Sequence, residues 1–91
     1  MITGSQLRAA RGLLNLSVSE LAEQTGLAIN TIRRAEGTSG PAPITVANMN
    51  LLAATFDAAG VVFIPAGEQG FGVRFKSPDV IAHQPRRKDA R

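Results

Sequence analysis

Amide, hydroxyl and guanidinium side chains gather in one short stretch of the chain, positions 28–36. The stretch also contains Ile29 and Ile32, so it has the mixed apolar and polar pattern of a short amphipathic helix. In the major groove of DNA, an amide can pair with adenine and a guanidinium group with guanine. The face of this predicted helix that suits such a groove consists of Asn30, Thr31, Arg33 and Arg34.

The residues just before this stretch have the spacing that two steeply crossing helices need. Leu21 and Ala22 are followed by Gly26 after three residues and by Ile32 after five more. A small residue such as Ala22 lets two helices approach, Gly26 tolerates the positive φ of a tight turn, and Ile32 would fill the crossing. The spacing therefore predicts a helix-turn-helix unit whose second helix begins at Ala28.

Helix-capping residues indicate where the neighbouring helices begin. Thr3 with Gln6, and Ser17 with Glu20, have the spacing of capping boxes, and Thr45 is a further N-cap. The predicted helices cover roughly positions 4–14, 18–24, 28–36 and 46–59, with an irregular loop over 37–44. The buried face of the last helix is predicted to contain Val46, Met49, Leu52, Ala53 and Phe56.

After Gly60 the pattern changes to that of strands. The apolar run 61–64 ends before Pro65, and positions 71–76 alternate apolar and polar residues, which together predict a β-hairpin. Both faces of the first strand are apolar, and a two-stranded hairpin is only marginally stable alone. A hairpin folded onto its own helices as a monomeric lid is one outcome. We favour a homodimer in which a second copy meets Val61, Val62, Phe63, Ile64, Phe71, Val73 and Phe75.

The segment from Leu21 to Glu36, LAEQTGLAINTIRRAE, resembles the helix-turn-helix of the XRE family, also called phage repressor and Cro-like. The resemblance extends over roughly residues 3–59. It implies a repressor-like arrangement of helices and double-stranded DNA as the partner. In place of the family's usual fifth helix, this chain has the predicted hairpin. The first helix and its entry into the second match the family at Leu7, Arg8, Arg11, Leu16 and Ser17.

The resemblance also implies roles for individual residues. Ser17, Ser19 and the amides at the start of the second helix correspond to phosphate-binding positions. Arg11 and Glu36 correspond to a partly buried ion pair that fixes the recognition helix (28–36) against the first helix; a plain surface pair is the alternative. The base-reading positions correspond to Ile29, Asn30, Thr31, Arg33 and Arg34.

Two departures from the family's pattern reduce the predicted DNA contacts. Ala28 and Ile29 open the recognition helix where the family often has Ser and Gln, which removes a cap and a base-reading amide. Ile29 is expected either to touch a thymine methyl group or to fill a gap in the core. The loop over 37–44 has no Lys or Arg that could contact phosphates.

Composition excludes several other classes of function. The 91 residues include no Cys and one His, which excludes a thiolate site, a multi-histidine metal site and a Cys nucleophile. No apolar run approaches the roughly 20 residues of a membrane span. The first residues also lack the pattern of a signal peptide, so we expect a cytoplasmic protein. The net charge of +3 fits a polyanionic partner.

Together these patterns predict a mainly α protein of the α+β class. It would have a helix-turn-helix domain of four helices over 1–60, a hairpin over 61–76 and a disordered basic tail over 77–91. We expect no enzyme activity, cofactor or metal, because the sequence has no catalytic constellation. The predicted function is that of a sequence-specific DNA-binding transcriptional regulator, a repressor. The alternatives are an antitoxin that neutralises a toxin and represses its own operon, and a protein-interaction module without DNA binding.

Overall fold

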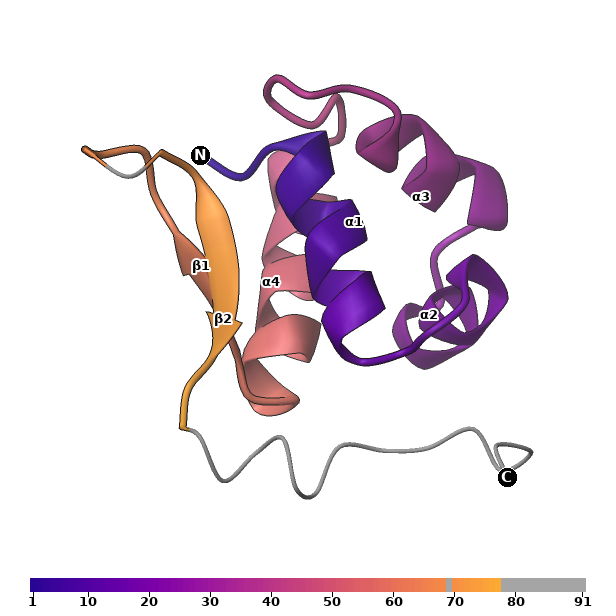
Figure 1. The fold of residues 1–91 in the computed structure, drawn as a ribbon. Coiled ribbons are helices and arrows are strands. Elements are labelled where there is room, and N and C mark those ends of the chain that lie inside the picture. Colours follow the sequence, from indigo (N-terminus) through magenta and orange to yellow (C-terminus); the bar gives the residue numbers. More distant parts are fainter. Residues whose placement is uncertain (69, 78–91) are drawn as a thin grey trace.

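Helices come first along the chain and strands last in the computed structural model, which describes residues 1–68 and 70–77. The helices are α1 (Gly4–Leu13), α2 (Val18–Thr25), α3 (Ile29–Glu36) and α4 (Val46–Ala58). Strands β1 (Val61–Ile64) and β2 (Gly72–Phe75) form an antiparallel hairpin. Figure 1 shows α1 between the hairpin and the α2–α3 pair. The α+β class is thereby confirmed, while the predicted tail, apart from Ser77, lies outside the described residues.

Side-chain caps start three of the four helices where the sequence predicts them. Thr3 Oγ1 accepts from the Gln6 amide at 3.1 Å, and Gln6 Oε1 accepts from the Thr3 amide at 2.9 Å. Ser17 and Glu20 form the same reciprocal pair at 3.0 and 2.8 Å. Thr45 accepts from the backbone amide three residues later. Each box satisfies donors that a helix start otherwise leaves unpaired.

The start of α3 differs slightly from its prediction. The helix begins at Ile29 rather than at Ala28, because Ala28 takes the N-cap position with an extended backbone. The methyl group of Ala28 cannot accept a hydrogen bond, and α3 accordingly has no side-chain cap. This confirms the expected loss of a cap.

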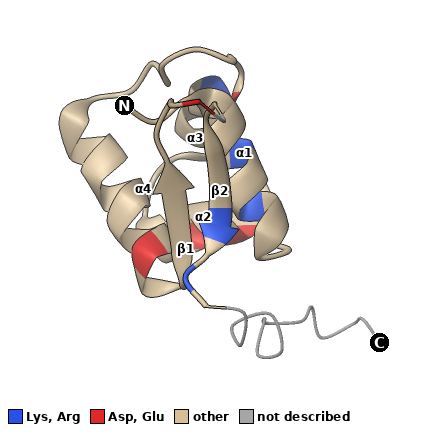
Figure 2. Cartoon of the chain, turned by 60° about the vertical axis from the view of Figure 1, so that its left-hand side comes forward, with Lys and Arg blue, Asp and Glu red and all other residues tan. Residues whose placement is uncertain are grey.

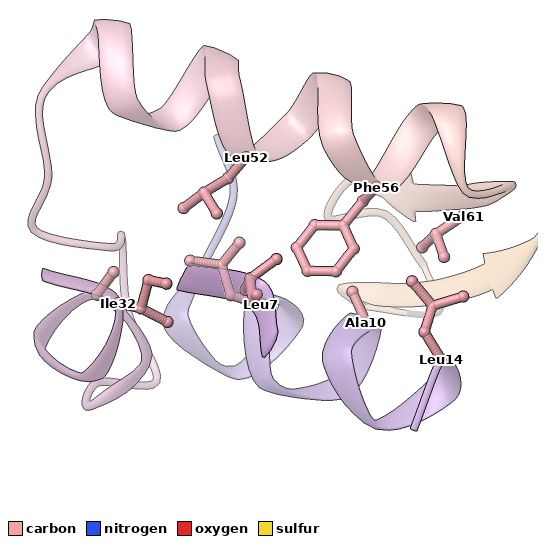
Figure 3. Packing of buried hydrophobic residues seen from close by; sticks show 9 residues of the cluster. Leu7, Ala10, Leu14, Ile32, Leu52, Phe56 and Val61 are labelled. Atoms are coloured by element: carbon pink, nitrogen blue, oxygen red, sulfur yellow. The ribbon is translucent and has the colours of Figure 1, made fainter. Parts of the chain in front are cut away.

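The core is built by residues from all four helices and β1. Figure 3 shows Leu52 and Phe56 of α4 pointing toward Leu7 and Ala10 of α1. The prediction for α4 is wrong at Val46, which is 76% exposed. Val46 is the first residue of the helix and borders an open hollow instead of a packed neighbour. The buried apolar residues are Leu7, Ala10, Leu14, Leu21, Ile32, Ala35, Leu52, Phe56 and Val61.

The hairpin turns one face toward the helices. Val61 pairs with Phe75, and Phe63 pairs with Val73, and all four pack on the core of their own chain. The Phe63 ring lies edge-on to Phe56 with centroids 5.8 Å apart. These four residues were predicted to meet a second copy, and in the single chain they are already covered. Of the seven hairpin residues predicted to form the dimer interface, only Val62, Ile64 and Phe71 lie outside this packing.

A buried glutamine joins α1 to both strands. Gln6 Nε2 donates to the carbonyl oxygens of Ile64 and Gly72, each at 2.9 Å. Its Oε1 is meanwhile occupied by the capping box with Thr3, so the whole carboxamide is satisfied although it is buried. The sequence indicates only the capping role of Gln6. Its second role fixes the hairpin against the start of α1.

Gly4 permits a close approach between the start of α1 and the segment that follows α3. The Gly4 amide donates to the Gly40 carbonyl at 3.0 Å, and Ala42 donates to the Ile2 carbonyl at 3.2 Å. A Cβ atom on Gly4 would lie 2.2 Å from the carbonyl oxygen of Thr38. No side chain fits there, so this contact holds the loop against α1 only when residue 4 is glycine.

Replacing Gly4 by alanine is expected to lower the free energy of unfolding by about 1–3 kcal/mol, the usual effect of overpacking. Gly12, also in α1, is the matched control, because a Cβ there meets nothing within 4 Å. Gly12→Ala should stabilise the protein by about 0.5–1 kcal/mol through helix propensity. Urea unfolding followed by circular dichroism measures both variants. Equal stabilities would contradict the close approach at Gly4.

Candidate nucleic-acid interface

The two sides of α3 have opposite environments. Ile32, Ala35 and Glu36 are buried against the rest of the domain. Of the predicted base readers, Asn30, Arg33 and Arg34 are exposed and Thr31 is half-buried. Within the described part of the chain, Asn30, Arg33 and Arg34 make no side-chain hydrogen bond or ion pair. Their amide and guanidinium groups are therefore available to a ligand.

Ile29 and Ala28 lie at the exposed start of α3. Ile29 is 38% exposed and does not belong to the core, so it fills no gap there. Its side chain adds an apolar group to the same end of the helix. An apolar group at this position is suited to contact with a thymine methyl.

The turn between α2 and α3 has the geometry that its spacing predicts. Gly26 has a φ of 79°, the left-handed conformation that glycine adopts without strain. Leu21 and Ile32 are both buried at the helix crossing. Thr25, which sequence reasoning missed, closes the turn by donating to the Leu21 carbonyl at 2.8 Å and accepting from the Leu27 amide at 3.2 Å. A threonine directly before a helix-ending glycine is the signal that could have found it.

Arg11 and Glu36 form the predicted ion pair. Arg11 Nε lies 2.9 Å from Glu36 Oε2, and Arg11 Nη2 lies 2.9 Å from Oε1, so the pair is bidentate. Arg11 Nη1 also donates to the Leu16 carbonyl at 3.0 Å. The two side chains are 23% and 6% exposed, which excludes a plain surface pair. The contact fixes the C-terminal end of α3 against α1.

A second arginine of α1 reaches the same end of α3. Arg8 Nη1 donates to the backbone carbonyl of Glu36, and Nη2 donates to Ser5 Oγ at 3.2 Å. A cation near a helix C-terminus interacts favourably with the unpaired carbonyls there. Hydrogen bonding to the Glu36 carboxylate raises the pKa of Arg11, against the opposing effect of burial. Both arginines thus contact the C-terminal end of α3 and leave its exposed side free.

The start of α2 is less open than the sequence suggests. Ser17 and Ser19 are exposed, as a phosphate contact requires. The hydroxyl and amide of Ser17 are, however, both engaged in the capping box with Glu20. The Glu20 carboxylate therefore lies where a phosphate would approach the helix start. Ser19 takes no part in the capping box, so its hydroxyl is the one of the two that is available for a phosphate contact.

In the described segments, Lys and Arg residues occur on α1, on α3 and at β2 with the residue that follows it. Figure 2 shows Lys and Arg on α1, α3 and the hairpin, while α2 and α4 carry only acidic charges. Of these cations, Arg11 is paired with Glu36 and Lys76 with Asp57. Arg8 and Arg74 donate to backbone carbonyls, which leaves Arg33 and Arg34 on α3 as the described cations whose side chains make no hydrogen bond or ion pair.

Other kinds of site find little support in the described residues. No three side chains from His, Cys, Asp and Glu come together there as metal ligands, and His83 lies outside the described part. None of the helices in residues 1–68 and 70–77 has the length and apolar character to cross a membrane. No family model, curated protein or solved structure matches this chain.

Arg11→Ala is expected to lower the free energy of unfolding by about 3 kcal/mol, the lower end for breaking a buried pair. The loss arises because Glu36 would stay buried without its charged partner. Asp57→Asn is the matched control, since the Lys76–Asp57 pair at 3.1 Å has side chains 46% and 70% exposed. An exposed pair contributes less than about 1 kcal/mol. Similar urea midpoints for both variants would contradict a structural role for Arg11.

Proposed function

We propose that this chain is a sequence-specific, double-stranded DNA-binding transcriptional regulator of the repressor-like helix-turn-helix type, acting in the cytoplasm as a dimer. The observation that carries the proposal is the outer face of α3. There Asn30, Arg33 and Arg34 are exposed and unpaired, while Arg8 and Arg11 hold the C-terminal end of the helix at Glu36. A rigid helix with free amide and guanidinium groups is what major-groove recognition requires.

In this proposal α3 enters the major groove and the start of α2 meets the backbone. Asn30 pairs with the N6 and N7 atoms of an adenine, and Arg33 or Arg34 pairs with O6 and N7 of a guanine. Ile29 contacts a thymine methyl. Phosphate contacts from Ser19 and nearby amides set the register of the helix without reading sequence. Bound over a promoter, such a protein acts as a repressor.

A two-fold dimer would read an inverted repeat. Two recognition helices lie one turn of DNA apart, so the half-sites are expected roughly 10 base pairs apart between centres. Selection of bound sequences from a random duplex library tests this directly. Recovery of a common inverted repeat supports the proposal. Failure to retain duplex against competitor DNA would instead favour a module that binds protein alone.

Arg34→Ala and Asn30→Ala are each expected to weaken binding to the selected duplex by about 1–3 kcal/mol. Binding to random duplex should change much less, because bidentate base contacts are lost rather than general attraction. Arg74→Ala on β2 is the matched control for charge, since Arg74 is exposed and lies on the hairpin. Titration of labelled duplexes at one fixed salt concentration measures all three. Equal losses on both duplexes would remove Arg34 and Asn30 from the base readers.

Glu20→Gln is expected to strengthen DNA binding about two- to fivefold, which corresponds to removing a charge effect of about 0.3–1 kcal/mol at a helix start. Glutamine can still accept from the Ser17 amide, so the capping box is preserved. Glu23→Gln is the control, because Glu23 is exposed on the same helix but away from its start. No gain for Glu20→Gln, or the same gain for Glu23→Gln, would place the phosphate elsewhere.

A further inference from the structure

The exposed start of α3 presents two apolar side chains before its first polar one. Ala28 is the N-cap and forms no side-chain hydrogen bond, and Ile29 is the first residue of the helix. Both residues are exposed, and neither side chain can donate or accept a hydrogen bond. Asn30 is the first side chain of α3 that can do so. Any group that contacts Ala28 and Ile29 is therefore recognised by its shape and apolar surface.

Ile29 lies at the border between the buried and the exposed side of α3. Residues three and four positions apart are neighbours on the surface of a helix. The neighbour of Ile29 on one side is the buried Ile32, and its neighbour on the other side is the exposed Arg33. Ile29 itself is 38% exposed and takes no part in the core. Its side chain thus belongs to the surface that the proposed function places against DNA.

The major groove offers one apolar group to such a side chain, the methyl group on C5 of thymine. In 5-methylcytosine a methyl group occupies the same position of the pyrimidine ring. Uracil and unmodified cytosine have a hydrogen atom there instead. Thymine and 5-methylcytosine differ at position 4 of the ring, where thymine has an oxygen acceptor and cytosine has an amino donor. The two bases therefore share the methyl group and differ in their hydrogen bonding.

We propose that Ile29 reads the C5 methyl group and not the identity of the pyrimidine, so that methylation of a cytosine in the bound site strengthens DNA binding. An apolar side chain cannot distinguish an acceptor from a donor at position 4 of the ring. The carboxamide of the next residue, Asn30, has both a donor and an acceptor and can meet either base. The inference rests on the proposed function and adds cytosine methylation as a regulator of the same site.

The test uses the duplex recovered from the random library and the full chain. Each thymine is replaced in turn by deoxyuridine, which removes only the methyl group. At one thymine the affinity should fall about fourfold, the effect of burying one methyl-sized group. At the same position a cytosine–guanine pair is then compared with a 5-methylcytosine–guanine pair, and methylation should raise the affinity by about the same factor. Each comparison keeps the partner base unchanged, so both affinity ratios measure the methyl group alone.

Ile29→Ala identifies the side chain that contacts the methyl group. In this variant both affinity ratios should fall below about twofold, because most of the apolar contact is lost. Leu51→Ala on α4 is the matched control, since leucine has as many carbon atoms as isoleucine and Leu51 is also 38% exposed. It lies outside α3 and should keep both ratios. Circular dichroism establishes that both variants are folded.

The outcomes separate this inference from the proposed function. Specific binding that no deoxyuridine weakens would overturn the inference alone, and so would a deoxyuridine effect without an effect of 5-methylcytosine. Ratios that persist in Ile29→Ala, or that fall equally in Leu51→Ala, would also overturn the assignment to Ile29. A chain that retains no duplex against competitor DNA would refute the proposed function, and the inference with it.

Discussion

The position of α3 depends on the buried carboxylate at its last residue. Glu36 is nearly inaccessible to solvent, and its two oxygens are taken by the fork of Arg11. A buried charge without a partner costs several kcal/mol. Turning α3 about its axis would separate Glu36 from Arg11 and would move Arg33 toward the core. One packing of α3 is thereby favoured, and with it the side of the helix that faces outward.

α1 connects this contact to the rest of the molecule. Its first turn holds the hairpin through Gln6 and the segment after α3 through Gly4, while Arg8 and Arg11 hold the end of α3. Both the hairpin and α3 are consequently positioned by the same ten-residue helix.

Charge divides the surface into areas with different uses. The two guanidinium groups of α3, at Arg33 and Arg34, make no hydrogen bond or ion pair within the described residues, which suits a polyanion. The exposed side of α4 is largely apolar, and its one charged residue, Asp57, is ion-paired with Lys76. At the start of α2 the capping box stabilises the helix and also places the carboxylate of Glu20 near the proposed phosphate. Helix stability and anion binding are in direct conflict at that one position.

Much of the fold follows from short-range patterns in the chain. Capping residues, Gly26 and helical spacing predict the helices to within about a residue or two, and alternation predicts the hairpin, because these features act between near neighbours. The Arg11–Glu36 pair was also predicted, though only through resemblance to a family. The second role of Gln6, the capping by Arg8 and the exposure of Val46 were not predicted. Each depends on which distant element lies alongside: Gln6 meets carbonyls 58 and 66 residues away. The sequence by itself determined the elements and the polar face of α3. Only the tertiary structure decided that the inner hairpin residues are covered by their own helices and that the apolar side of α4 is not, because burial is a property of packed neighbours and not of residue type.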